Sequence, residues 1–189
     1  MKYATIVADP PWPMPTSGKW TGQGGNWAAY NGGLTELPYD TLTVDQIADL
    51  PVAELIATEG YVFLWTTNRF IEEAFRVVRA WTLRPRQVLV WCKPPMGQGM
   101  GGMFTTNVEF VVVAQRIGKS NAHGKRTNGL RIDTSWFQWP RAGHSQKPEA
   151  FLDLVEQVSP GPYLELFARR QRLGWDTWGN EALEHVEIG

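Results

Sequence analysis

The stretch that decides the fold is YATIVADPPW, residues 3–12. Its first six residues are apolar or β-branched, and Asp9, Pro10 and Pro11 follow them directly. Such a run is typical of a strand buried on both faces, and the prolines end it because proline has no N–H to donate to a neighbouring strand. We therefore expect a strand over 3–8 with a rigid, polar segment at its carboxyl end.

Apolar runs and helical patterns alternate along the rest of the chain. We expect further strands over 61–65, 87–92, 108–114 and 163–167, and helices over 44–57, interrupted by Pro51, over 68–81 and over 148–158. This order predicts an α/β protein with a mostly parallel sheet covered on both faces. The loop between 92 and 108 is too short for a crossover helix, so its two strands are expected to form an antiparallel pair. Ligands of such sheets bind beyond the carboxyl ends of the strands.

Length and composition narrow the class of protein. A chain of 189 residues predicts one domain over 1–189. Cys92 is the only cysteine, which excludes internal disulfides and cysteine-based zinc sites and favours a reducing cytoplasm, the host's if the gene belongs to a phage. We expect no signal peptide, no membrane span and no metal site, because the three histidines have no metal-ligand spacing.

The near-neutral net charge of −1 conceals two oppositely charged segments. Residues 20–68 carry six acids and no Lys or Arg, whereas residues 115–147 carry seven bases against one acid. A basic segment of this kind either contacts phosphates or is a solvated loop. The bases with the right placement for phosphates are Arg116, Lys119, Lys125, Arg126 and Arg131, and Trp136 and Trp139 either stack on bases or pack beside them.

The segment Asp9-Pro10-Pro11-Trp12 suits the chemistry of an exocyclic amine such as N6 of adenine. A carboxylate accepting one N–H and a prolyl carbonyl accepting the other would hold the amine while its nitrogen attacks an electrophilic methyl group. The prolines fix the backbone, and Trp12 offers a face for a base. The alternative interpretation is a rigid turn with a packing tryptophan.

Motifs along nearly the whole chain resemble the MT-A70-type adenine N6-methyltransferases, the family of the messenger-RNA adenosine methyltransferase subunit, in a small form like those of phages and bacteria. They are Asp9 to Trp12, Leu37 to Tyr39 with Thr41, Leu64 to Thr67, Trp91 with Lys93, Glu109, His144 to Glu149, Glu165 to Arg169, and Gly174-Trp175 with Trp178 to Asn180.

The resemblance implies a Rossmann-like methyltransferase fold that uses S-adenosylmethionine, with a permuted order in which the catalytic strand comes first and the cofactor strand near the C-terminus. It implies catalysis by Asp9, Pro10, Pro11 and Trp12. It implies cofactor binding, with Lys147 on the carboxylate, by Asp9, Pro10, Lys147, Glu165, Phe167, Arg169, Asn180 and Glu181. We expect substrate contacts from Trp12, Tyr39, Trp65, Lys93, Glu109, Lys125 and Arg126.

Several of these residues also have purely structural interpretations. Lys147 fits a solvated helix entrance, Arg169 a surface charge, and Phe167, Tyr39 and Trp65 packing positions. The chain also begins directly at the catalytic strand, so we expect the upstream segment of longer family members to be absent.

Three functions follow as hypotheses. The first is methyl transfer from S-adenosylmethionine to N6 of adenine in DNA. The second is the same reaction on RNA, and the third is a catalytically silent nucleic-acid-binding subunit. The expected partner is a nucleic acid, DNA before RNA, and a homodimer or a partner subunit is compatible with each.

Overall fold

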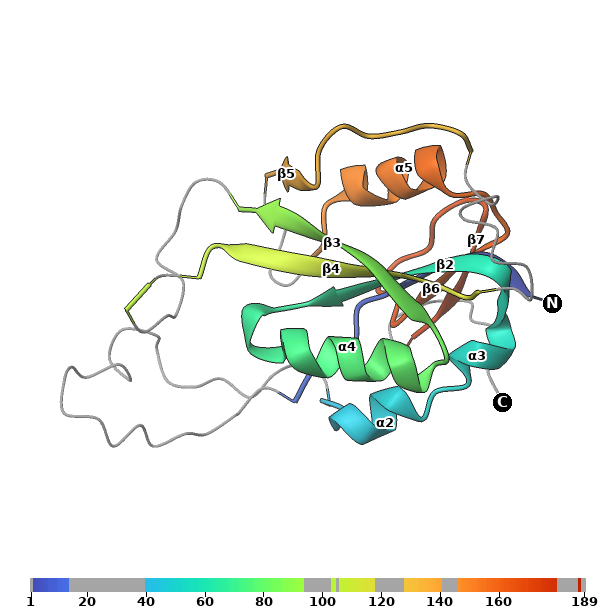
Figure 1. Ribbon diagram of the computed structural model, residues 1–189, viewed down its shortest axis with the longest axis horizontal. Helices are drawn as coiled ribbons and strands as arrows, with labels where there is room; N and C mark the ends of the chain where they lie inside the picture. Colours follow the sequence, from blue (N-terminus) through green and yellow to red (C-terminus); the bar gives the residue numbers. More distant parts are fainter. Residues whose placement is uncertain are drawn as a thin grey trace.

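The computed structural model describes residues 2–13, 40–93, 103–104, 106–117, 128–140, 146–179 and 187. Within these ranges one sheet carries helices on both faces (Figure 1). Its strands are β1 Tyr3–Ala8, β2 Ile56–Thr66, β3 Arg84–Cys92, β4 Val108–Gln115, β5 Trp136–Gln138, β6 Tyr163–Leu166 and β7 Trp175–Trp178. The helices are α2 Val44–Ala48, α3 Val52–Leu55, the 3-10 helix η1 Asn68–Phe70, α4 Ile71–Ala80 and α5 Glu149–Val158.

The strand order is β5-β3-β4-β2-β1-β6-β7. Strand β4 runs antiparallel to both of its neighbours, β2 and β3, and every other described pair is parallel. The mostly parallel sheet, the antiparallel pairing of β3 with β4 and the α/β, Rossmann-like fold class are thereby confirmed. Strand β1 lies between β2 and β6, and all six of its residues are buried.

Alternate residues of β1 face two separate apolar cores. Ile6 and Ala8 pack toward α2, α3 and α4, whereas Val7 packs with Phe151 and Val155 of α5. Figure 1 shows these helices on opposite faces of the sheet. Burial on both faces explains why residues 3–8 form a continuous apolar run instead of an alternating one.

The expected helix over 44–57 is shorter in the structure and divides at Pro51. Thr43 caps α2 by a capping box, because its Oγ1 accepts from the Gln46 N–H at 3.1 Å and the Gln46 side chain accepts from the Thr43 N–H at 2.8 Å. Strand β2 then begins at Ile56, well before the expected residue 61. Its pairing with β1 shifts register between Ile56 and Tyr61. Within this stretch Glu59 has a positive φ of 65°, an irregularity that interrupts the regular strand.

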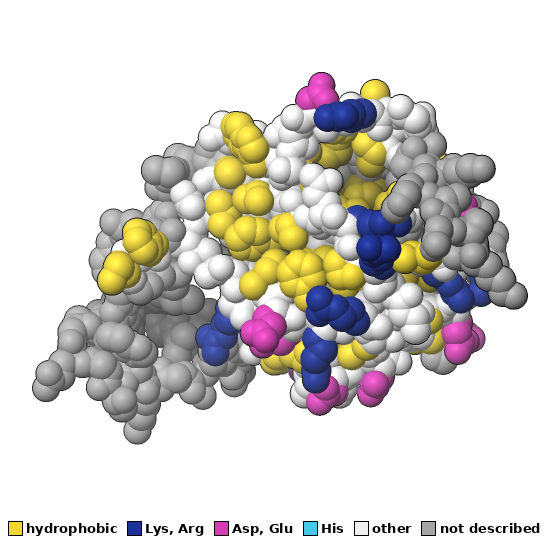
Figure 2. All heavy atoms as spheres, viewed as in Figure 1, with side chains coloured by type: hydrophobic (Ala, Val, Ile, Leu, Met, Phe, Trp, Pro, Cys, Tyr) yellow, Lys and Arg dark blue, Asp and Glu magenta, His cyan; other side chains and the backbone are white. Residues whose placement is uncertain are grey.

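Two short strands, β5 and β7, were not predicted from the sequence. Each is three or four residues long and rich in tryptophan, and each lies at one edge of the sheet. Figure 2 shows hydrophobic side chains across the middle of the view, over β3 and β4, with Lys and Arg side chains along the lower and right border of this patch. Most of β3 is accordingly half-buried or exposed. No helix in the described residues is long and apolar enough to cross a membrane.

Candidate active site

Asp9 to Trp12 lie at the carboxyl end of β1, where a parallel sheet presents side chains to a ligand. The Asp9 N–H donates to the Leu166 carbonyl of β6 at 3.4 Å, the last rung between these strands. Beyond it the Trp12 N–H donates to the Pro10 carbonyl at 2.8 Å. The Pro11 carbonyl accepts from the Leu42 N–H at 2.9 Å, so the segment is held in one conformation as expected.

Trp12 lies in the core, which differs from the expectation that it offers an open face to a base. Its side chain is 6% exposed, and its ring stacks on Phe70 with centroids 5.5 Å apart and an interplanar angle of 12°. Its indole N–H donates to the Trp65 carbonyl at 3.0 Å. Burial of this large ring and its hydrogen bond stabilise the position of Trp12. Trp12 therefore anchors the segment that carries Asp9.

Four charged side chains converge at this edge of the sheet, and we call them the edge cluster: Asp9, Lys93, Glu109 and Lys147. Lys147 Nζ lies 2.8 Å from Asp9 Oδ2 and 3.4 Å from Glu109 Oε2, and Glu109 also pairs with Lys93. The side chains are only 17–22% exposed. Because β4 is antiparallel, its first residues meet the carboxyl ends of β1 and β3, which brings Glu109 to the other three.

Mutual attraction favours the charged forms of Lys147 and Glu109 despite their burial. Burial alone would lower the pKa of Lys147, but the carboxylates of Asp9 and Glu109 outweigh that effect and raise the pKa. Burial alone would raise the pKa of Glu109, but Lys147 and Lys93 outweigh it and the pKa is lowered. The cluster therefore holds alternating charges in a partly dry setting.

Two tryptophan rings lie under the lysines of the edge cluster. Lys147 Nζ is 5.3 Å from the ring centroid of Trp65, and Lys93 Nζ is 4.8 Å from that of Trp91. The two rings pack edge to face, 5.9 Å apart. Trp65 is 1% exposed, so it supports Lys147 from below, whereas we had expected it to contact the substrate directly.

Glu165 of β6 is half-buried, and its charge interacts with that of Asp9 in the edge cluster. It pairs in register with Val7 of β1, and its Oε2 is buried with no hydrogen-bond partner among the residues that the structure describes. Burial raises its pKa to about 7, with the negative charge of Asp9 acting in the same direction and Arg170 opposing it. A buried carboxylate oxygen without a donor is unusual in a native structure, and among the described residues Thr67 Oγ1 and Glu73 Oε2 are in the same state.

The chain bends sharply directly after β6. Phe167 has a positive φ of 64°, and its ring packs edge to face on Trp178, 5.3 Å away. The Ala168 N–H donates to the Trp178 carbonyl at 3.0 Å, and a Cβ at Gly179 would lie 2.5 Å from the Ala168 carbonyl oxygen. Only glycine fits at this close approach. The bend after β6 directs the chain to the half-buried Arg169.

Arg116, which we had expected to contact phosphate, has a structural role instead. Its guanidinium donates to the carbonyls of Ala53 and Ile56. Ile56 begins β2, so this contact lies at the amino ends of the parallel strands, opposite the edge cluster at their carboxyl ends. Arg131 is exposed beside Asp133, Trp136 is 59% exposed, and Trp139 stacks on Phe137 at 4.6 Å. Arg131 and Trp136 therefore remain accessible.

The structure brings together most of the described residues that the sequence singled out. Asp9, Lys93, Glu109 and Lys147 meet directly, with Trp65 beneath them, and Glu165 lies nearby. The predicted roles of Tyr39, Lys125, Arg126, Asn180 and Glu181 lie outside the described residues. Sequence reasoning missed Phe70 as the partner of Trp12, and no local signal marks that contact. Among described residues, no group of three His, Cys, Asp or Glu side chains is arranged to hold a metal ion.

A cavity of about 250 Å³ lies away from the edge cluster, between α5, the middle of the sheet and residues 130–137. Its walls are mainly apolar and include Phe63, Leu89 and Val155. None of the predicted catalytic or cofactor residues lines it, so this cavity is separate from the candidate active site.

Comparison with known proteins shows which family the chain is similar to. The MT-A70 family model matches residues 3–181. The type II methyltransferase M.MunI of Mycoplasma sp is 30% identical over 198 residues, which cover 99% of this chain and 81% of that protein.

Longer proteins match as well. The N(6)-adenosine-methyltransferase catalytic subunit METTL3 of Homo sapiens is 26% identical over 196 residues, covering 95% of this chain but 28% of its own length. The N(6)-adenosine-methyltransferase MT-A70-like of Arabidopsis thaliana is 26% identical over 192 residues, covering 95% of this chain and 24% of its own. The chain thus spans about a quarter of the length of these two relatives.

Proposed function

The chain belongs to the MT-A70 family of methyltransferases, and from this premise we propose that it transfers a methyl group from S-adenosylmethionine to N6 of adenine in DNA. The observation that carries the proposal is the position of Asp9. Its carboxylate stands at the carboxyl end of the central strand, oriented by Lys147 at 2.8 Å and followed by a rigid prolyl segment.

The residues around Asp9 suit an amine nucleophile. A carboxylate has two oxygens, and the ion pair with Lys147 leaves Asp9 with acceptor capacity for one N–H of the amine. The Pro10 carbonyl accepts one hydrogen bond from Trp12 and has a second lone pair for the other N–H. Held in this way, the amine would present its nitrogen lone pair to an electrophilic methyl group. As the C–N bond formed and the bond from the methyl carbon to sulfur broke, the excess proton would pass along its hydrogen bond to the Asp9 carboxylate.

The described residues fit S-adenosylmethionine. When bound, this cofactor supplies an electrophilic methyl group on a sulfonium, which leaves as a neutral thioether. Within the described part of the chain nothing donates to Glu165 Oε2, and a ribose hydroxyl would supply a donor. Lys147 has three N–H bonds, of which Asp9 and Glu109 take two, so one remains for the cofactor's carboxylate. We assign Phe167, Arg169, Asn180 and Glu181 to the adenosine side.

The acceptor strand requires phosphate contacts and an unstacked base. We assign Lys93, Glu109 and Tyr39 to the acceptor pocket, and Lys125 and Arg126, together with the exposed Arg131 and Trp136, to the polymer. Trp12 and Trp65 act from the core, by holding Asp9 and Lys147 in place. We treat residues 1–189 as one methyltransferase domain working in the cytoplasm.

DNA is our first choice of acceptor because the chain aligns with most of a type II methyltransferase. RNA is the alternative, since the names of the longer relatives specify adenosine. The test is a competition in which equal amounts of DNA and RNA oligonucleotides are incubated with the protein and methyl-labelled cofactor. We expect label mainly in DNA, and label mainly in RNA would favour the alternative.

Calorimetry with S-adenosylmethionine tests the cofactor assignment separately from the acceptor. We expect wild-type protein to bind the cofactor. If it binds none, alone or with nucleic acid, a catalytically silent nucleic-acid-binding subunit becomes the better interpretation.

A further inference from the structure

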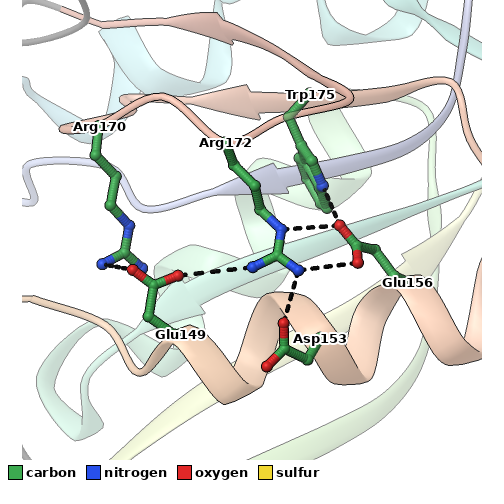
Figure 3. Close-up of polar contacts among 6 residues, drawn as sticks. All are labelled: Glu149, Asp153, Glu156, Arg170, Arg172 and Trp175. Atoms are coloured by element: carbon green, nitrogen blue, oxygen red, sulfur yellow. Dashed lines mark hydrogen bonds and ion pairs between the residues drawn. The ribbon is translucent and has the colours of Figure 1, made fainter.

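A dense group of ion pairs lies on the outer side of α5, apart from the edge cluster. Arg172 is at its centre, in the segment between β6 and β7 (Figure 3). Its Nε and Nη2 reach the two carboxylate oxygens of Glu156 at 2.8 and 2.9 Å, and Nη2 also lies 2.6 Å from Asp153 Oδ1. Its Nη1 lies 3.6 Å from Glu149. All three guanidinium nitrogens of one arginine therefore contact acids of a single helix.

The three acids lie on one side of α5 because they are spaced four and three residues apart. The bidentate contact with Glu156 has a geometry that arginine provides and lysine does not. Arg172 is 21% exposed, less than any of the three carboxylates that it contacts. The hydrogen bonds from Arg172 and from the Trp175 indole lower the pKa of Glu156 below its ordinary value, and they outweigh burial, which acts in the opposite direction.

The same contacts fix the turn that leads into β7. The Trp175 N–H donates to the Arg172 carbonyl at 3.1 Å, and the indole N–H of Trp175 donates to Glu156 at 2.7 Å. The Trp175 ring stacks on Tyr163, the first residue of β6, at 4.7 Å. Arg170 adds an ion pair with Glu149 (Figure 3). The segment between β6 and β7 is thus fastened to α5 at both of the helix's ends.

These contacts connect two sides of the proposed cofactor site. Lys147 precedes the first residue of α5 by two positions and reaches Asp9. Glu165, Phe167 and Arg169 lie on the other side, in β6 and at the start of the segment that Arg172 holds. The distance between Lys147 and this second group depends on how α5 sits against the segment.

We propose that Arg172 is a positioning residue for the cofactor site: by clamping α5 to the segment between β6 and β7, it sets the spacing between Lys147 and the group from Glu165 to Arg169. This inference rests on the proposed function. Arg172 itself does not touch the reacting atoms. Its loss should therefore weaken cofactor binding more than it slows the chemical step.

The test compares Arg172→Met with the control Arg76→Met. Arg76 also pairs with a helical acid, Asp45, but on the opposite face of the sheet and with a side chain 58% exposed. Calorimetry gives the Kd for S-adenosylmethionine, and thermal melting reports folding. Steady-state kinetics with varied S-adenosylmethionine separates the KM for this cofactor from kcat. We expect Arg172→Met to raise Kd and KM about tenfold with kcat changed less than about threefold, and Arg76→Met to leave all of them near wild type.

Arg172→Lys keeps the test decisive if Arg172→Met folds poorly, and a double variant extends the test where Arg172→Met folds. Arg172→Lys retains the charge without the bidentate contact and should raise Kd by about threefold. Adding Asp153→Asn to Arg172→Met should raise Kd no further, since Asp153 acts through Arg172.

The failures of the two proposals are distinguishable. Wild-type protein that binds no cofactor would overturn the proposed function and this inference with it. Wild-type binding combined with an unchanged Kd in both Arg172 variants, even with a lowered melting temperature, would overturn the positioning role alone and leave a structural clamp.

Discussion

The edge cluster and the pair of Arg76 with Asp45 use the same kinds of charge in opposite settings. Lys147 and Asp9 come from positions 138 residues apart, meet with side chains about 20% exposed, and lie over a tryptophan ring. Arg76 and Asp45 meet on the surface of α4 and α2, with side chains 58% and 79% exposed.

The difference indicates what each arrangement is for. Exposed ion pairs contribute little to stability, and water replaces either partner at small cost. Burying charges is expensive and seldom improves stability over an apolar packing. We therefore propose that the four charged side chains of the edge cluster serve a ligand rather than stability. Substitutions in the two settings test this contrast.

The largest effect is expected at Asp9. Asp9→Asn keeps the size of the side chain but removes the charge that pairs with Lys147 and that would receive the amine in the proposed reaction. Methyl transfer should fall on the order of 1000-fold, the loss typical of removing a preorganised electrostatic contact to a transition state. Labelled methyl transfer measures the loss, and circular dichroism verifies folding. Retention of more than about a tenth of the activity would remove Asp9 from the catalytic role.

The next effect concerns stability. Lys147→Met leaves the carboxylates of Asp9 and Glu109 near each other without their shared cation. The free energy of unfolding should fall by about 3 kcal/mol, because an uncompensated charge remains partly buried. Urea denaturation measures this change. A loss below about 0.5 kcal/mol would show that Lys147 contributes no more than an exposed ion pair. The energetic difference between the edge cluster and the pair of Arg76 with Asp45 would then be absent.

Glu165 provides a pH-dependent test. Its pKa of about 7 in the folded state exceeds the ordinary 4.5, so folding binds this proton more tightly than the unfolded chain does. Its stabilising contribution is complete below the ordinary pKa and is lost as the pH rises through about 7. Relative to Glu165→Gln, wild-type protein should lose up to about 3 kcal/mol between pH 4 and pH 8, roughly the window of the shift. Parallel stability curves for the two proteins would contradict the raised pKa of Glu165.

The smallest effect is expected at the exposed pair. Asp45→Asn removes one partner of Arg76, and the free energy of unfolding should change by less than about 0.5 kcal/mol. Urea denaturation at low and high salt is the measurement. A larger loss that disappears in salt would show that this surface pair carries more energy than its exposure suggests.

Much of the fold was predictable from the sequence because its main strands have strong local signals. The run 3–8 forms β1 with the expected bounds, β3 begins three residues before the expected strand, and β4 ends one residue after it. Strands β5 and β7 escaped prediction because three or four residues rich in tryptophan show no periodicity. The first half of β2 was missed because the pair Glu59-Gly60 is typical of a turn in sequence. In the structure Glu59 has a positive φ but lies within the strand.

The candidate site was predictable in membership but not in geometry. The motifs singled out Asp9, Glu109 and Lys147, yet their meeting depends on an antiparallel β4 that brings its first residues to the carboxyl edge. The burial of Trp12 and Trp65 depends on neighbours distant in the sequence, and a residue type alone does not separate an aromatic ring that packs from one that stacks on a base.

The most direct test of the proposed reaction is mass spectrometry of nucleosides after the protein has been incubated with S-adenosylmethionine and either DNA or RNA. We predict N6-methyldeoxyadenosine from DNA with wild-type protein and none with Asp9→Ala. Methylation at another atom or base, or an unchanged yield from Asp9→Ala, would contradict the claim that the carboxylate at the end of β1 directs methyl transfer to N6 of adenine.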